Sequence, residues 1–309
     1  MSADEKNSLV SSTFRPIKFH EEPIFPNPQK LIILSAAPGS QISKEQNPNL
    51  PTTPEEIVKN HVDAYKAGAS MVHVHVRDEK GNPTGDPELY KRVILDIKDK
   101  CPDVIIDCCF AHPLEIDTVE ARLEPLMKLN LPIETGVLSA GSINVVGKNV
   151  YINREEYLIK AVQYIQECNI RPIITVYNVK NIVDMKRWAM DSGLVKRPFL
   201  NLSLGLMGDP AQRDILDFWF KYLPGPNDCD CIVETAGRNW LPVTVEAILS
   251  QRGHVRAGME DGIYMYGHKN DLIKSSAEVV TKVRTIAEQV GREIATAKEA
   301  RQILNLPGK

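Results

Sequence analysis

Residues 53–78 read TPEEIVKNHVDAYKAGASMVHVHVRD and combine one helix with one strand. Thr53, Pro54 and Glu56 mark a helix start, with a capping threonine, a proline at the first helical position and a glutamate where a capping box has one. The run MVHVHV from Met71 then alternates in the period-two pattern of a strand. The segment therefore predicts a helix that leads into a strand, which is the repeating unit of an α/β fold.

The same alternation continues along the whole chain. Apolar, β-branched runs alternate with helical segments, as is typical of βαβ units and a parallel sheet. The strands that we expect are LIILSAA from Leu31, MVHVHV from Met71, VIIDC from Val104, IETGV from Ile133, RPIITVY from Arg171, FLNLSLG from Phe199, CIVETA from Cys231 and HVRAGM from His254. Eight strand–helix units in about 280 residues predict a single TIM-type (β/α)8 barrel. A doubly wound open sheet is the alternative, but neither GxGxxG nor GxxxxGK[ST] follows a strand.

The ends of the domain and further helix starts can also be predicted. Residues 1–30 carry four prolines and no sustained periodicity, so we interpret them as an N-terminal arm before a barrel domain at 31–309. Cap-then-proline pairs predict helices that start after Asp86 and Asp209. The last helix is expected to begin near Asn270.

The bulk composition excludes several classes of protein. The chain has 309 residues, 43% of them hydrophobic, with a formal net charge of -3, so nothing indicates a nucleic-acid partner. No apolar run approaches the roughly 18 residues of a membrane span, and the N-terminus lacks the apolar stretch of a signal peptide. We therefore expect a cytoplasmic protein that makes no membrane contact, with its six cysteines as reduced thiols.

Two histidines stand two residues apart in the second strand, Val72-His73-Val74-His75-Val76. Strand side chains alternate between faces, so both imidazoles share one face and the valines share the other. Valines suit the helix-facing side of a barrel strand, which leaves the imidazoles inside, near the carboxyl end where barrel active sites lie. A shared metal ion satisfies two buried imidazoles at once. A pair of hydrogen-bonded core histidines is the alternative, and the pattern favours the metal.

A third metal ligand is expected from a neighbouring strand end. The eighth strand runs into Gly258-Met259-Glu260-Asp261. In a closed barrel the second and eighth strands both flank the first, so ligands from their ends can converge above it. Two imidazoles and the Glu260 carboxylate, with positions left open for substrate, form a catalytic rather than a structural set.

Arg256 and Asp261 come from the same segment as Glu260. A carboxylate beside a cation and a metal ion can act as a general base with a fixed orientation. A structural Arg–Asp ion pair accounts for the local sequence equally well. Both interpretations stay open on the sequence alone.

From Leu31 to Leu306 the chain resembles the β-keto acid cleavage enzymes. The HxH and GHxRxGxED motifs, in this order and separation, are the specific part of the resemblance. The segments that carry it are Ser35-Ala36-Ala37, Pro48-Asn49-Leu50-Pro51, Thr53-Pro54-Glu55-Glu56, Ala67-Gly68-Ala69, His73-Val74-His75-Val76-Arg77-Asp78, Ser139-Ala140-Gly141, Gly237-Arg238 with Leu241-Pro242, and Gly253-His254-Val255-Arg256-Ala257-Gly258-Met259-Glu260-Asp261.

The resemblance implies a fold, a metal ion and a reaction. It implies a TIM barrel with zinc, or another divalent ion, on His73, His75 and Glu260, assembled as a homo-oligomer, a tetramer in this family. It also implies an acyltransferase, in which a β-keto acid and acetyl-CoA give acetoacetate and a new acyl-CoA by a retro-Claisen route. Asp261, oriented by Arg256, removes the α-proton from the bound keto acid.

The sequence departs from the family pattern around the expected substrate. Aminohexanoate-type members hold the substrate amine with a glutamate after the first strand, whereas residues 38–43 read PGSQIS here. The family's Ser-Thr-Gly-Gly after the third strand becomes CFAH at 109–112, and a threonine at the end of the fourth strand becomes Val137. We therefore expect the same reaction on a different acyl group. The predicted substrate-binding residues are Cys109, His112, Val137 and Ser139.

Other residues were weighed individually. Arg238 follows the seventh strand, where barrels often bind phosphate, and is the candidate contact for a coenzyme A phosphate; a structural arginine at the rim is the alternative. His112 either contacts substrate or caps the following helix, and the role of Glu234, an acid near the mouth, stays open. Cys229 and Cys231 begin the seventh strand at the opposite end, so we interpret them as buried thiols rather than a metal site.

Two rival functions are consistent with the same residues. One is a metal-dependent barrel lyase or aldolase that works through an enolate without coenzyme A, which product analysis with and without acetyl-CoA would distinguish. The other is a non-catalytic binding protein that keeps the metal ion as part of its fold. Open coordination positions favour catalysis over this second rival.

Overall fold

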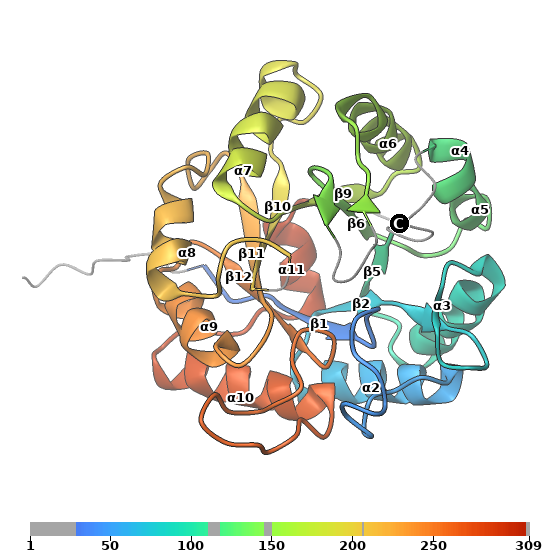
Figure 1. Cartoon of the computed structure of the whole chain (residues 1–309), viewed down its shortest axis with the longest axis vertical. Coiled ribbons are helices and arrows are strands. Elements are labelled where there is room, and N and C mark those ends of the chain that lie inside the picture. Colours follow the sequence, from blue (N-terminus) through green and yellow to red (C-terminus); the bar gives the residue numbers. More distant parts are fainter. Residues whose placement is uncertain (1–28, 111–117, 145–149, 206, 307–309) are drawn as a thin grey trace, which may run out of the picture.

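The computed structural model describes residues 29–110, 118–144, 150–205 and 207–306, which form a closed barrel of parallel strands inside a ring of helices (Figure 1). The barrel strands are β1 (Ile33–Ala37), β2 (Met71–Val74), β5 (Ile105–Cys109), β6 (Thr135–Ser139), β9 (Arg171–Val176), β10 (Phe199–Leu204), β11 (Asp230–Thr235) and β12 (His254–Gly258). They pair in the order β1-β12-β11-β10-β9-β6-β5-β2. The predicted barrel and its eight strands are confirmed, and the doubly wound sheet is excluded.

Helices on the outside of the barrel cover the strands (Figure 1). They are α2 (Pro54–Ala67), α3 (Pro87–Lys100), α4 (Val119–Arg122), α5 (Glu124–Met127), α6 (Glu155–Glu167), α7 (Val179–Met185), the π-helix η1 (Lys186–Asp191), α8 (Arg213–Phe220), α9 (Trp240–Leu249), α10 (Ser276–Gln289) and α11 (Ala297–Ile303). Two small hairpins, β3 (Val76–Arg77) with β4 (Pro83–Thr84) and β7 (Ile143–Asn144) with β8 (Val150–Tyr151), follow the carboxyl ends of β2 and β6.

The helix starts test the capping predictions. Thr53 closes the capping box of α2 with Glu56, and the Asp86 carboxylate caps α3, as predicted. The Asp209 prediction was wrong, because α8 begins four residues later and the Asp209 carboxylate accepts a hydrogen bond from the Trp219 indole at 2.9 Å instead. The prediction that the last long helix begins near Asn270 was also wrong, because α10 begins at Ser276.

The correction for that last helix has a simple cause. Residues 270–275 run extended: Leu272 bridges to Tyr264 and the Ile273 amide donates to the Ile263 carbonyl. The helix α10 starts only when Ser275 supplies a side-chain cap to the Glu278 amide.

Inward-facing side chains change from apolar to polar along the barrel axis. At the amino ends of the strands, an apolar cluster fills the interior, and α11 packs across that end. The cluster contains Ile32, Leu34, Met71, Ile105, Ile173, Phe199, Ile232, Ala297, Ala300 and Leu304. Further along the same faces come histidines, acids and hydroxyls. Because the lower interior is filled with apolar side chains, polar chemistry is confined to the carboxyl end of the barrel.

Two predictions concern parts of the chain other than the barrel core. Residues 1–28, which make up nearly all of the predicted N-terminal arm, lie outside the described residues, so the arm stays a prediction. Among the helices that the structure describes, none combines the length and the apolar character needed to cross a membrane.

Candidate metal centre and active site

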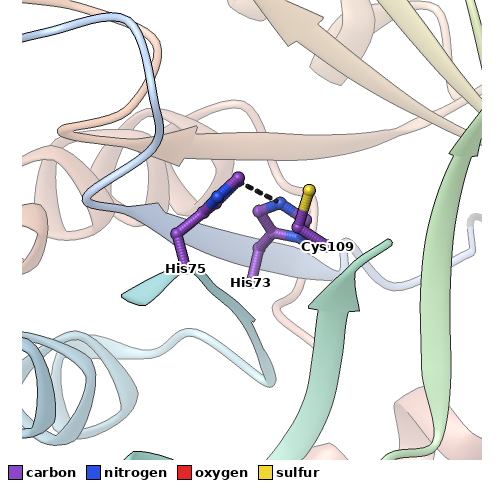
Figure 2. Close-up of side chains that lie close together, drawn as sticks. All are labelled: His73, His75 and Cys109. Carbon is purple, nitrogen blue, oxygen red and sulfur yellow. Dashed lines mark hydrogen bonds between the residues drawn. The ribbon is translucent and has the colours of Figure 1, made fainter. Parts of the chain in front are cut away.

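The structure places His73 and His75 at the carboxyl end of β2 with both rings inside the barrel. Their Nε2 atoms lie 3.2 Å apart, and the rings meet edge to face (Figure 2). Both side chains are almost wholly buried, at 2% and 5% exposure. Val72 and Val74 pack on the other face in the core beneath the helices. The alternation of the strand therefore directs both imidazoles to one point.

Asp107 on the adjacent strand β5 fixes the orientation of His73. The two residues are register partners, and His73 Nδ1 lies 2.5 Å from Asp107 Oδ2. Thr135, the next partner along on β6, donates to Asp107 Oδ1 at 2.7 Å. An imidazole that donates through Nδ1 keeps the Nε2 lone pair for a metal ion. The sequence analysis missed Asp107, although an acid inside the buried run VIIDC was a signal for it.

We expect Asp107→Asn to weaken metal binding by about 10–100-fold, the usual cost of losing an outer partner of a ligand histidine. His73 and Thr135 donate to different oxygens of Asp107, and in asparagine one of these oxygens becomes an NH2 group, which cannot accept a hydrogen bond. Competition with a chelator would measure the affinity. Thr135→Val leaves the contact between Asp107 and His73 intact and should lower the metal affinity less. An unchanged metal affinity in Asp107→Asn would contradict the proposed role of Asp107.

Glu260 approaches the histidine pair from the other side of β1. Its Oε1 lies 3.1 Å from His75 Nε2, and its Oε2 lies 3.9 Å from His73 Nε2. β1 pairs with both β2 and β12, so the three side chains that the sequence analysis named as candidate ligands converge above it. Gly39, at φ +68°, folds the following loop over Glu260, and a Cβ there would lie 2.3 Å from Glu260 Cγ. The loop conformation therefore requires glycine.

These three residues fit a divalent cation. Glu260 Oε2 is buried and has no hydrogen-bond partner among the described residues. Burial opposes the charged imidazoles, yet the Glu260 carboxylate raises the pKa of His73 to about 9, and Cys109 and Glu260 raise that of His75 to about 10. Neighbours that favour a positive charge on the rings also favour a cation between them. The unpaired oxygen and the two facing nitrogens would all find a partner in one ion.

Arg256 connects the carboxylates of this site. Its Nε and Nη2 donate to the two oxygens of Asp261 at 3.1 and 2.9 Å, and Nη2 also reaches Glu260 Oε1 at 2.8 Å. Glu234 lies 3.6 Å from Nη1. Burial raises the pKa of Asp261 to about 7 against the pull of Arg256, with Glu234 and Glu260 adding to the rise. The predicted Arg–Asp pair is thus present, bidentate and buried.

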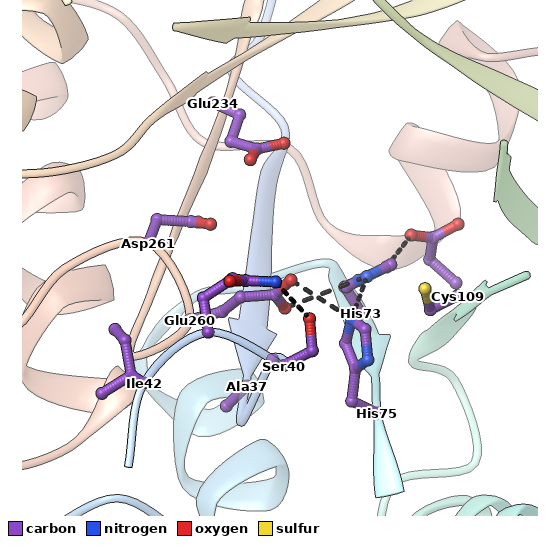
Figure 3. Close-up of polar contacts among 12 residues, drawn as sticks. Ala37, Ser40, Ile42, His73, His75, Cys109, Glu234, Glu260 and Asp261 are labelled. Atoms are coloured by element: carbon purple, nitrogen blue, oxygen red, sulfur yellow. Dashed lines mark hydrogen bonds and ion pairs between the residues drawn. The ribbon is translucent and has the colours of Figure 1, made fainter. Parts of the chain in front are cut away.

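Two cavities meet at Glu260, which lines both together with Gln41. The first, which we call the metal cavity, holds His73 and His75 and has a volume of about 80 Å³. The second, which we call the outer cavity, has a volume of about 250 Å³ and is lined by Asp261. Figure 3 shows Glu234, Glu260 and Asp261 on one side of the histidine pair and Cys109 on the other.

Most of the remaining predicted residues line the metal cavity. Cys109, Val137 and Ser139 line the metal cavity, and the Ser139 hydroxyl lies 2.9 Å from that of Tyr177. Glu234 also lines the metal cavity and accepts hydrogen bonds from Asn201 and Ser203.

Three further predictions concern the rim and the opposite end of the barrel. Arg238 is exposed at the outer cavity, stacked 3.8 Å over the Tyr264 ring. His112 lies outside the described residues. Cys229 and Cys231 sit at the amino end of β11 with their thiols directed at backbone carbonyls, as expected of buried thiols.

Several known proteins are similar to this chain over most of its length. A sequence model of the beta-keto acid cleavage enzyme family matches residues 30–306. The chain is 36% identical to the 3-keto-5-aminohexanoate cleavage enzyme of Acetoanaerobium sticklandii, over 90% of this chain and 99% of that one. It is 29% identical to the 3-oxoadipate:acetyl-CoA acetyltransferase of Cupriavidus necator, over 90% and 96%. The apo structure of ObcA matches 84% of this chain and 66% of its own at a TM-score of 0.68 and 17% identity, which supports the fold.

Proposed function

Because the chain belongs to the β-keto acid cleavage enzyme family, we propose that it converts a β-keto acid and acetyl-CoA into acetoacetate and a new acyl-CoA with the help of zinc. The observation that carries the metal-dependent part is the convergence of two imidazole nitrogens, 3.2 Å apart, with a carboxylate whose second oxygen is buried and has no hydrogen-bond partner among the described residues. His73, His75 and Glu260 are the proposed ligands. A divalent ion there supplies Lewis-acid polarisation of the keto oxygen.

The chain's own residues then move the proton. In the proposed reaction Asp261 accepts the α-proton of the keto acid, and Arg256 holds both oxygens of Asp261 so that the base cannot rotate away. The same Nη2 contacts Glu260, which fixes the base relative to the proposed metal ligand. This shared contact supports a catalytic role over a purely structural ion pair.

The proposed route balances without a further reactant. The α-carbon forms a bond to the acetyl carbonyl and releases the coenzyme A thiolate, which attacks the original keto carbonyl. The bond between that carbonyl and the α-carbon then breaks, and the α-carbon takes back the proton held by Asp261 as acetoacetate leaves. We place the keto acid in the metal cavity with its α-carbon at the junction of the two cavities, beside Asp261, and acetyl-CoA in the outer cavity, with Arg238 near its phosphates.

The direct test is a panel of β-keto acids incubated with and without acetyl-CoA. Acetoacetate should form only when acetyl-CoA is present, together with the matching acyl-CoA. Cleavage without acetyl-CoA would favour a lyase or aldolase, and binding of substrate without turnover would favour a binding protein. The homo-oligomeric state stays a prediction that sedimentation would test.

The metal cavity also narrows the class of keto acid. Its lining includes Val137, Ile143, Tyr151 and Met207, and three of its lining residues, Ile143, Tyr151 and Tyr177, form one apolar cluster. With a volume of about 80 Å³, it is small beside the 300–1,000 Å³ typical of ligand pockets. We propose a substrate with a short, uncharged acyl chain.

We expect 3-ketohexanoate to exceed 3-keto-5-aminohexanoate in kcat/KM by about tenfold or more, because Glu234, the acid that lines this cavity besides the proposed ligand Glu260, already has Asn201, Ser203 and Arg256 as partners. Each 1.4 kcal/mol is tenfold, and a buried ammonium without a free partner costs more than that. Steady-state kinetics on the two compounds would measure the ratio. Gln41→Glu places a further acid in the same cavity and should lower the ratio of kcat/KM for 3-ketohexanoate to kcat/KM for the amino compound. A native enzyme that prefers the amino compound would refute the proposed substrate class.

A further inference from the structure

Cys109 lies closer to the histidine pair than a residue that only lines the substrate cavity needs to. It ends β5, and its Sγ and one nitrogen from each of His73 and His75 all lie within 4.8 Å of one another (Figure 2). The side chain is 8% exposed. On β5, Ile105, Asp107 and Cys109 alternate inward, so the strand that orients His73 through Asp107 also delivers this thiol to the same point.

The thiol and Glu260 approach the imidazoles from opposite sides. Figure 3 shows Cys109 on the β5 side of His73 and Glu260 on the β12 side. Two imidazole nitrogens thus stand between a sulfur and a carboxylate. These four donors correspond in number and chemical type to the ligands that four-coordinate zinc accepts.

We propose that the Cys109 thiolate is the fourth ligand of the resting metal centre, beside His73, His75 and Glu260. The inference rests on the proposed metal set and adds a sulfur to it. When the ion binds, the S–H bond gives up its proton to solvent and a metal–sulfur bond forms, with no change of oxidation state. Two anionic ligands then neutralise a divalent ion, which suits a buried site.

A sulfur ligand has consequences for metal choice and for substrate binding. Thiolate favours zinc and disfavours magnesium, manganese and calcium, which prefer oxygen donors. It also means that the keto acid oxygens must either displace sulfur or enter as additional ligands, as catalytic zinc sites allow. Cys109 therefore makes the resting centre selective for the ion and more closed than a two-histidine, one-carboxylate set.

X-ray absorption at the zinc edge of the native holoenzyme tests the proposal, with Cys109→Ala and Cys108→Ala as a matched pair. Both substitutions remove one buried thiol from β5, but Cys108 points into the core beneath the helices. The native protein should show one sulfur at about 2.3 Å besides nitrogen and oxygen ligands at about 2.0–2.2 Å. The sulfur should vanish in Cys109→Ala and persist in Cys108→Ala, with about one metal ion per chain in each.

Three outcomes would refute the proposal. A native site with metal but only nitrogen and oxygen ligands would remove Cys109 and leave the His73, His75 and Glu260 set standing. A sulfur that persists in Cys109→Ala would also refute it. Native protein that binds no metal would refute both the sulfur ligand and the metal-dependent function. If Cys109→Ala does not fold, the native spectrum and the thiolate-to-cobalt charge-transfer band of cobalt-loaded native protein decide alone.

Discussion

Replacing His73 by alanine is expected to remove most of the bound metal ion and, with it, turnover of β-keto acids. His73 is the ligand whose ring is fixed by Asp107, and its Nε2 faces both His75 Nε2 and Glu260. Losing an outer partner of a ligand costs about 10–100-fold in affinity or activity, so losing the ligand itself should cost more than that. Elemental analysis of the purified variant would measure the metal content.

His254→Ala is the matched control for this substitution. Like His73, His254 is a buried histidine on a barrel strand, but it lies at the amino end of β12, where its Nδ1 accepts a hydrogen bond from the Ile32 amide at 3.1 Å. The control should lose stability and keep its metal. A fully occupied metal site in His73→Ala, with the fold intact, would show that the ion is held elsewhere.

Most of the fold could be predicted because the signals are local. Each barrel strand is a short apolar run, and eight such runs separated by helical segments leave few alternatives. The errors came where a contact with a distant part of the fold outweighed a local sequence signal. Asp209 precedes a proline and reads as a helix cap, yet the Trp219 indole from the following helix takes its carboxylate. Capping preference is worth only about 1 kcal/mol, so such a contact can override it.

Those parts of the site that follow from strand alternation and from the pairing of neighbouring strands could be predicted. The shared face of His73 and His75 follows from a period of two, and the approach of Glu260 follows from the pairing of β1 with β2 and β12. What could not be predicted depends on register. That Asp107 sits opposite His73, and that Cys109 therefore comes near the histidine pair, is set by how β5 aligns with β2.

The division of the acids between the two cavities depends in part on a loop path. Glu234 lies on β11, two residues after the inward-facing Ile232, so alternation accounts for its place in the metal cavity, whereas Asp261 faces the outer cavity because of how the chain turns after β12. No periodicity in the sequence encodes this turn. The assignment of the base therefore needs a kinetic experiment.

Asp261→Asn is expected to keep the metal ion, the fold and substrate binding but to lower turnover by on the order of a hundredfold or more, as loss of a general base does. The amide has nearly the shape of the carboxylate, and Arg256 keeps its contacts with Glu260 and Glu234. Exchange of the keto acid's α-protons in deuterated water, without acetyl-CoA, reports proton abstraction alone. That exchange should fall in parallel with turnover.

Glu234→Gln gives the comparison that separates the two acids. Glu234 shares Arg256 with Asp261 at 3.6 Å, but it lacks the bidentate contact that fixes the orientation of Asp261, and its own oxygens accept hydrogen bonds from Asn201 and Ser203. We therefore expect α-proton exchange to fall further in Asp261→Asn than in Glu234→Gln. If Asp261→Asn exchanges at the native rate while Glu234→Gln does not, then the base is the acid that lines the metal cavity. Asp261 would in that case serve only to hold Arg256 against Glu260.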